Sequence, residues 1–113
     1  MNFYVSLFAD GEILDMAKYG PGQAGPDGSV IRASFRIAKQ TIICIDSPIK
    51  HAFTFTPAFS LFVDCENEHE LERLYAALLG GGMAMMPLDN YGFSRRFGWI
   101  SYRFGVSWQL NLP

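Results

Sequence analysis

Few side chains in this chain belong to the types that metal binding or nucleophilic catalysis requires. The densest group is the segment DCENEHE at residues 64–70, which gathers one cysteine, one histidine and several carboxylates. Its spacing matches none of the usual zinc patterns. Each residue suits instead the end of a strand or the start of a helix, where short polar side chains cap the backbone. The segment predicts a helix N-terminus and no metal site.

The two cysteines are expected to be buried, reduced thiols. Cys44 as a nucleophile would need a neighbouring base, and His51 and His69 are the only histidines in the chain. His51 falls in the connector KHAFTFTP, where a surface or dimer contact is expected. Cys44 and Cys65 each lie in an apolar, strand-like run, TIICID and SLFVDC. Because two cysteines are too few for a disulfide framework, a cytoplasmic protein is expected.

Two further motifs could bind an anion. Residues 20–25, GPGQAG, match the G-x-G-x-x-G spacing of dinucleotide-binding loops, but a strand-like segment follows where that chemistry requires a helix. A hairpin loop is therefore predicted there. The paired guanidinium groups of Arg95 and Arg96 could hold an anionic group at a pocket mouth, or could belong to a solvated turn.

Alternating apolar and polar residues predict strands in the first half of the chain. Residues 29–40, SVIRASFRIAKQ, alternate as a strand with one buried face does. The apolar positions are Ile31, Ala33, Phe35 and Ile37. A strand at 12–19 precedes a loop rich in turn formers, so the two strands are predicted to form a hairpin. Residues 41–46, TIICID, are apolar as in a strand covered on both faces.

One strong helix is predicted over residues 67–79. Asn67 can cap its N-terminus together with Glu70, and the glycines at 80–82 end it. Strands are predicted again in MAMMPL, FGWISYRF and VSWQLNL. The apolar stripe of the helix, at helical spacing, consists of Leu71, Leu74, Tyr75, Leu78 and Leu79.

The two halves of the chain resemble each other at a constant offset of 71 residues. FYVSLFADGEILDM aligns without gaps on LYAALLGGGMAMMP, which places Tyr4 on Tyr75 and Gly11 on Gly82. Each copy is a helix followed by three strands, so an internal duplication is predicted. The second copy also has a strand, AFSLFVDC, before its helix. The repeat therefore predicts a further strand and the start of a helix ahead of Met1.

The composition excludes several classes of protein. A chain of 113 residues suits one domain, residues 1–113, with modules at 1–50 and 56–113. Half of its residues are hydrophobic and 18% are charged, which predicts that some surface faces a pocket or the second subunit of a homodimer. The net charge of -2, without a basic stripe, argues against nucleic acid as a partner. No segment suggests a signal peptide or a membrane span, so no membrane partner is expected.

The order of these elements, together with three segments, resembles a known family. NFYVSLFADGEIL, TPAFSLFVDCENEHELERLYAALLGGG and GWISYRFGVSWQL are similar to the PhnB-like branch of the vicinal oxygen chelate superfamily, which includes glyoxalase I, extradiol dioxygenases and bleomycin-resistance proteins. This branch is often labelled 3-demethylubiquinone-9 3-methyltransferase. The resemblance implies an α+β, glyoxalase-like fold of two βαβββ modules around a cavity, with the first strand missing from this chain.

The resemblance also implies where a divalent metal would bind, and those positions are poor in ligands. One of the four falls ahead of the sequence. The second falls near Cys44 or Asp46, of which only Asp46 could ligate. The others fall at Ala58 or Ser60 and at Gln109, whose amide is a poor ligand. One carboxylate does not make a metal site, so no metal and no cofactor are expected.

We expect a PhnB-like protein whose cavity binds a small molecule. Aromatic walls with a few polar groups suit such a pocket. The expected orienting groups are Asp46, Ser60 and Gln109, with Trp99 and Trp108 as aromatic walls. The sequence identifies neither the ligand nor any catalytic residue.

Three alternatives stay open. The chain could be a metal-dependent lyase or dioxygenase-type enzyme whose upstream strand supplies a histidine. It could be the methyltransferase that the family label names, although it has no glycine-rich loop that opens a helix for S-adenosylmethionine. It could also be a structural dimer with a filled barrel. Whether the protein is an enzyme is not determined by these residues.

Overall fold

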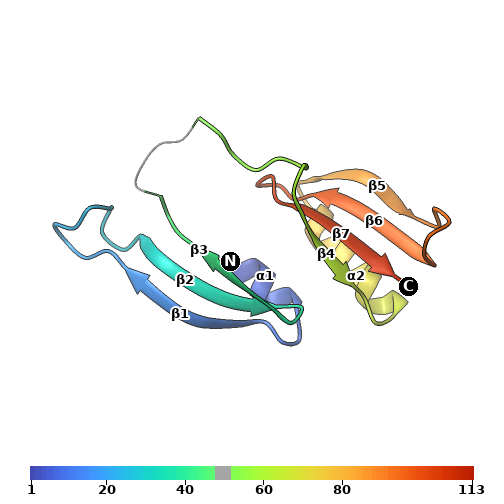
Figure 1. The fold of residues 1–113 in the computed structure, drawn as a ribbon, viewed down its shortest axis with the longest axis horizontal. Coiled ribbons are helices and arrows are strands. Elements are labelled where there is room, and N and C mark those ends of the chain that lie inside the picture. Colours follow the sequence, from blue (N-terminus) through green and yellow to red (C-terminus); the bar gives the residue numbers. More distant parts are fainter. Residues whose placement is uncertain (48–51) are drawn as a thin grey trace. The chain divides into compact units, whose positions relative to one another are not determined.

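The chain forms two compact units of α+β structure, Met1–Ala52 and Phe53–Pro113 (Figure 1). The structure is a computed structural model that describes residues 1–47 and 52–113. The first unit contains α1 (Asn2–Leu7), β1 (Glu12–Lys18), β2 (Val30–Ile37) and β3 (Gln40–Cys44). The second unit contains β4 (Ser60–Asp64), α2 (Glu68–Leu79), β5 (Met83–Asp89), β6 (Arg96–Ser101) and β7 (Ser107–Leu112).

The first unit is an antiparallel sheet in the order β1-β2-β3 with α1 packed on β1 and β2. The predicted hairpin of β1 and β2 is confirmed, and Ala33, Phe35 and Ile37 are buried as the alternation predicts. Ile31, at the start of β2, is 38% exposed. The prediction that residues 41–46 are covered on both faces is wrong for the described chain. Ile43 and Ile45 are 55% and 61% exposed.

The tight turn between β2 and β3 is held by the carboxylate of Asp10. Ala38 and Lys39 have positive φ angles of 47° and 65°, which are typical of two-residue hairpin turns. The backbone N–H groups of Lys39 and Ala38 donate to Asp10 at 2.7 and 3.0 Å. The hydrogen bond from Lys39 is the main reason why the pKa of Asp10 lies below its ordinary value of 3.8. Asp10 is therefore expected to be ionised whenever this turn is formed at neutral pH.

Replacing Asp10 by asparagine is expected to lower stability at neutral pH and to weaken its dependence on acid. A carboxyl whose pKa is lower in the folded state adds stability above its unfolded pKa, and that stability is lost as the pH falls through the folded value. The measurement is urea unfolding by circular dichroism between about pH 7 and pH 2. Asp27→Asn, in the loop between β1 and β2, is the control. An unchanged acid dependence in Asp10→Asn would contradict this role.

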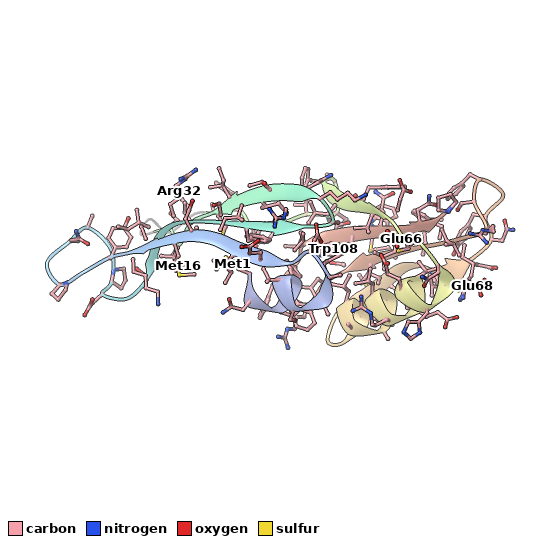
Figure 2. All side chains as sticks on the ribbon, turned by 90° about the horizontal axis from the view of Figure 1, so that it is seen from below. Met1, Met16, Arg32, Glu66, Glu68 and Trp108 are labelled. Atoms are coloured by element: carbon pink, nitrogen blue, oxygen red, sulfur yellow. The ribbon has the colours of Figure 1, made fainter. Side chains whose placement is uncertain are left out.

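The second unit is a mixed sheet in the order β4-β7-β6-β5, with β4 parallel to β7 and the other pairs antiparallel. Figure 2 shows α2 lying along one face of this sheet. The predicted helix is confirmed, and the side chain of its N-cap, Asn67, accepts a hydrogen bond from the backbone N–H of Glu70 at 2.8 Å. The core of the unit consists of side chains with no exposed surface: Leu71, Leu74, Leu78, Ile100, Trp108, Leu110 and Leu112.

The predicted internal duplication is confirmed in the order of the elements and in the spacing of the first strand of each copy. The bounds of β1 and β5 are related by the same offset of 71 residues that the sequences show. The N–H of Gly11 donates to the carbonyl of Phe8 at 3.0 Å, and the N–H of Gly82 donates to that of Leu79 at 2.8 Å. These hydrogen bonds join equivalent positions, so both copies turn from helix to strand in the same way. The strand expected ahead of Met1 stays a prediction.

Candidate functional site

The two faces of the second sheet differ in what covers them. Arg96, on β6, forms an ion pair of 2.6 Å with Glu72 of α2. A Cβ added to Gly98 would lie 3.0 Å from the ring of Tyr75, also on α2. Because side chains alternate along a strand, Arg96, Gly98 and Ile100 face the helix. The residues between them therefore belong to the opposite face.

We call this opposite face the site face. Cross-strand partners share a face of the sheet, so the register assigns its members on β4, β6 and β7. They are Ser60, Phe62, Asp64, Phe97, Trp99, Ser101, Ser107, Gln109 and Asn111.

Three side-chain hydrogen bonds cross between strands on the site face. Gln109 Nε2 donates to Ser60 Oγ at 2.5 Å. Trp99 Nε1 donates to Ser107 Oγ at 2.6 Å. The third joins Asn111 Nδ2 to an oxygen of Asp64 at 2.9 Å. A side chain held in this way loses little further freedom when a ligand binds, so these bonds pre-organise the polar groups of the face.

A cluster of aromatic rings lies at one end of the site face. Phe97 is 4% exposed, and the ring centroids of Phe93, Tyr91 and Phe62 lie 5.0, 6.2 and 6.3 Å from its own. Phe93 is 63% exposed and Phe62 is 50% exposed. We call these four residues the aromatic cluster. No local pattern in the sequence joins these four residues, because they come from β4, β6 and the loop after β5.

Three of the five residues expected to line a pocket lie together on the site face. Trp99 and Gln109 are direct partners across β6 and β7, and Ser60 is bonded to Gln109. Asp46 lies in the first unit, where its carboxylate accepts a hydrogen bond from the backbone N–H of Val30 at 2.8 Å. That bond fixes the open end of the β2–β3 hairpin.

The expectation that Trp108 forms a pocket wall does not fit its position. Trp108 alternates with Gln109 along β7 and is paired with Ile100, which places it on the face toward α2. Its side chain has no exposed surface. Trp108 is therefore a core residue, and Trp99 is the tryptophan of the site face.

The other candidates from the sequence have structural roles where the structure describes them. Arg95 Nε donates to the carbonyl of Pro113 at 2.7 Å, whereas Arg96 pairs with Glu72, so the two guanidinium groups do not converge on one anion. Residues 20–25 form part of the loop between β1 and β2, as predicted. Across residues 1–47 and 52–113, no three His, Cys, Asp or Glu side chains are placed to hold a metal ion. His51 lies outside the described residues.

The two cysteines differ in their surroundings. Cys65 is 4% exposed, and burial is the main cause that raises its pKa to about 12, followed by the charges of Glu70 and Asp64. Cys44 is half-buried. Both thiols are free, and of the two cysteines predicted to be buried only Cys65 is fully buried.

A thiol-specific reagent is expected to modify Cys44 before Cys65 in the folded protein. The thiolate is the reactive form, and at about pH 8 a thiol with the raised pKa of Cys65 is almost entirely protonated. Labelling followed by mass spectrometry measures both rates, with Cys44→Ser and Cys65→Ser as single-thiol controls. Equal labelling of Cys65 in native protein and in urea would contradict this prediction.

Comparison with known proteins gives consistent matches. The family model described as 3-demethylubiquinone-9 3-methyltransferase matches residues 1–111. Protein YjdN of Escherichia coli (strain K12) is 26% identical over 91 residues, which are 80% of this chain and 61% of YjdN, so the chain spans less than two thirds of that relative.

Solved structures extend this likeness to the fold. A PhnB protein from Bacillus cereus matches with a TM-score of 0.95 and 47% identity over 100% of this chain and 88% of that one. A protein from Pseudomonas aeruginosa matches with a TM-score of 0.83 and 25% identity over 98% of this chain and 84% of that one. None of the described helices is long and apolar enough to cross a membrane. With its α+β, glyoxalase-like fold, the chain belongs to the 3-demethylubiquinone-9 3-methyltransferase-like, or PhnB-like, family.

Proposed function

We propose that this PhnB-like protein binds a small organic molecule on the site face of its second sheet. The observation that supports this is the row of cross-strand hydrogen bonds beside a cluster of partly exposed aromatic rings. Binding sites for small molecules combine apolar and aromatic surface with a few placed polar groups. The site face contains both kinds of group on rigid strands.

Gln109 and Ser60 are the proposed orienting groups. The amide N–H of Gln109 is used by Ser60, but the Gln109 carbonyl oxygen can accept a further hydrogen bond. Ser60 accepts that N–H with its oxygen, so its own hydroxyl hydrogen can be donated. The second N–H of the Gln109 amide is also unused by Ser60, so the pair offers both acceptor and donor groups to a ligand. Trp99, half-buried beside Gln109, adds an aromatic surface.

We further propose that binding needs no metal. Hydroxyl and amide groups are weak ligands for divalent transition metals compared with imidazole, thiolate and carboxylate. The carboxylate of Asp46 accepts a hydrogen bond from the backbone instead. The proposal of metal-free binding therefore rests on the chemical types of the side chains at Ser60, Gln109 and Asp46.

A metabolite library screened by thermal shift tests the proposal, followed by affinity measurements on variants. Gln109→Met keeps the size of the side chain and removes both polar atoms, so the affinity of a hit is expected to fall about tenfold. Gln40→Met, at the start of β3 in the first unit, is the matched control and is expected to leave affinity unchanged. Affinity should also be unchanged after EDTA treatment. A library without hits, or hits that bind Gln109→Met equally well, would overturn the proposal.

A second copy of the chain is the proposed protein partner. The second unit exposes large apolar side chains that a small monomer seldom leaves in water. They include Phe53, Phe55, Phe59 and Phe104, each more than 60% exposed. Sedimentation velocity over a range of concentrations tests for the homodimer, and a monomer at all concentrations would contradict it.

A further inference from the structure

We infer that the aromatic cluster binds the cationic group of an organic ligand, a protonated or quaternary amine. This inference rests on the proposed function and adds to it the chemical class of the ligand. Two independent features carry it: the arrangement of the rings, and the sign of the charges beside them.

The rings of the cluster lie close together, and two of them are nearly parallel. The planes of Tyr91 and Phe93 differ by 15°, with centroids 6.3 Å apart. Both are steeply inclined to Phe97, at 85° and 71°. Two nearly parallel rings therefore stand on a third, and Phe93 and Tyr91 remain 63% and 39% exposed. A cation is attracted to the negative face of an aromatic ring within about 6 Å of its centroid.

Two carboxylates flank the same cluster. Asp89 on β5 is the cross-strand partner of Phe97. On the other side, Phe97 is paired with Asn111 of β7, which is paired with Asp64 of β4. Since directly paired residues share a face of the sheet, both carboxylates lie on the site face. Asp64 and Asp89 are also exposed to solvent.

Three arginines of this unit have partners other than these two carboxylates. Arg96 pairs with Glu72 on the face toward α2, and Arg95 bonds to the carbonyl of Pro113. Arg103 lies over the rings of Phe104 and Tyr102, with 5.0 and 5.6 Å to the centroids. In the described parts of the chain, the ion pairs are Arg96–Glu72 and Arg36–Glu12. Neither Asp64 nor Asp89 forms an ion pair with a basic residue in the described parts of the chain.

These charges discriminate between classes of ligand. An anion would be repelled by both carboxylates, and a neutral apolar molecule would gain contact with the rings but nothing from Asp64 and Asp89. An ammonium group is attracted both by the faces of the rings and by the negative charges of the carboxylates. The observed combination therefore favours a cation.

Choline and its neutral analogue 3,3-dimethyl-1-butanol test this inference, because they share a shape and differ in charge. Titration is followed by ¹H–¹⁵N NMR on the full chain at matched ionic strength. Choline is expected to shift the signals of residues 89–97 and to bind at least about threefold more tightly than the alcohol. Raising the salt concentration should weaken choline binding, because exposed charges are screened.

Three variants complete the test. Phe93→Leu removes one ring and Asp89→Asn one charge, and each is expected to weaken choline binding by about twofold or more. Phe104→Leu, in the turn between β6 and β7, removes another exposed ring and is expected to have no effect. Thermal unfolding confirms that each variant is folded.

Three results would overturn the inference. The first is an equal affinity for choline and for the alcohol. The second is an equal loss of choline affinity in Phe93→Leu and Phe104→Leu. The third is a change in the NMR signals of residues 89–97 on dilution without ligand, which would indicate a contact between copies of the chain. If choline does not bind, while a neutral or anionic metabolite binds and loses affinity in Gln109→Met, the inferred class of ligand is wrong and the proposed function stands. If no metabolite binds through Gln109 either, the proposed function fails as well.

Discussion

Replacing Gly82 by alanine is expected to destabilise the second unit by about 3 kcal/mol, the upper part of the range for forced overpacking. A Cβ at this position would lie 2.3 Å from the carbonyl oxygen of Ser101 and 3.2 Å from the backbone nitrogen of Arg103. Both are backbone atoms, so no side chain can turn away to make room. The start of β5 would have to move away from β6, which disturbs the pairing of Met83 with Ser101.

Gly80→Ala is the matched control for this prediction. Gly80 is exposed, has a φ angle of -55°, and a Cβ there would meet nothing closer than 3.8 Å. Its effect should stay within about 0.5 kcal/mol. Urea unfolding followed by tryptophan fluorescence reports on the second unit, because Trp99 and Trp108 both belong to it. Similar stabilities of Gly82→Ala and Gly80→Ala would show that the close approach of β5 and β6 is easily relieved.

Replacing Trp108 by alanine is expected to cost about 3–5 kcal/mol of stability, as for other large aromatic side chains removed from a core. Trp108 has no exposed surface and packs in the layer between the sheet and α2. A domain of this size is stable by only about 5–15 kcal/mol, so this variant can lose its fold at moderate temperature. Trp108→Phe, with an expected loss of about 1–2 kcal/mol, keeps the prediction measurable.

Comparing Trp99→Phe with Trp108→Phe distinguishes a tryptophan that stabilises the core from one that contacts a ligand. Trp99 lies on the site face and is only half-buried, with its indole N–H bonded to Ser107. This variant is expected to lose less stability than Trp108→Phe and more affinity for a bound metabolite. Urea unfolding and affinity measurements on both folded variants make the comparison. A Trp108→Phe variant with normal stability and lost binding would restore Trp108 as a pocket wall.

Local sequence patterns predicted the elements of this fold well. The spacing of Leu71, Leu74 and Leu78 identified α2, because residues on one face of a helix recur at intervals that a short segment already displays. The offset between the two halves identified the equivalent glycines, Gly11 and Gly82. The first observation needs only residues that are close together in the sequence. The second needs only the comparison of two segments of the sequence. The resemblance to the PhnB-like family rests on the same segments and is confirmed.

The roles of individual polar residues required the tertiary structure. Asp10 binds the turn at Ala38 and Lys39, and no local pattern connects positions so far apart. Asp46, one of the expected orienting groups, accepts a hydrogen bond from the backbone N–H of Val30 at the open end of the β2–β3 hairpin. A carboxylate accepts hydrogen bonds equally well from a ligand or from the backbone, so its type does not reveal its partner.

Patterns within the sequence were enough to predict the α+β class, the helix over residues 67–79, most strands, the duplication and the family. Which side chains share a face of the sheet follows from the strand pairing in three dimensions. Moving one residue along a strand reverses the face that a side chain occupies, and this separates Gln109 on the site face from Trp108 in the core. The aromatic cluster is likewise assembled around Phe97 from separate segments of the chain. Strand register, which depends on pairing between distant segments, therefore decides the candidate site.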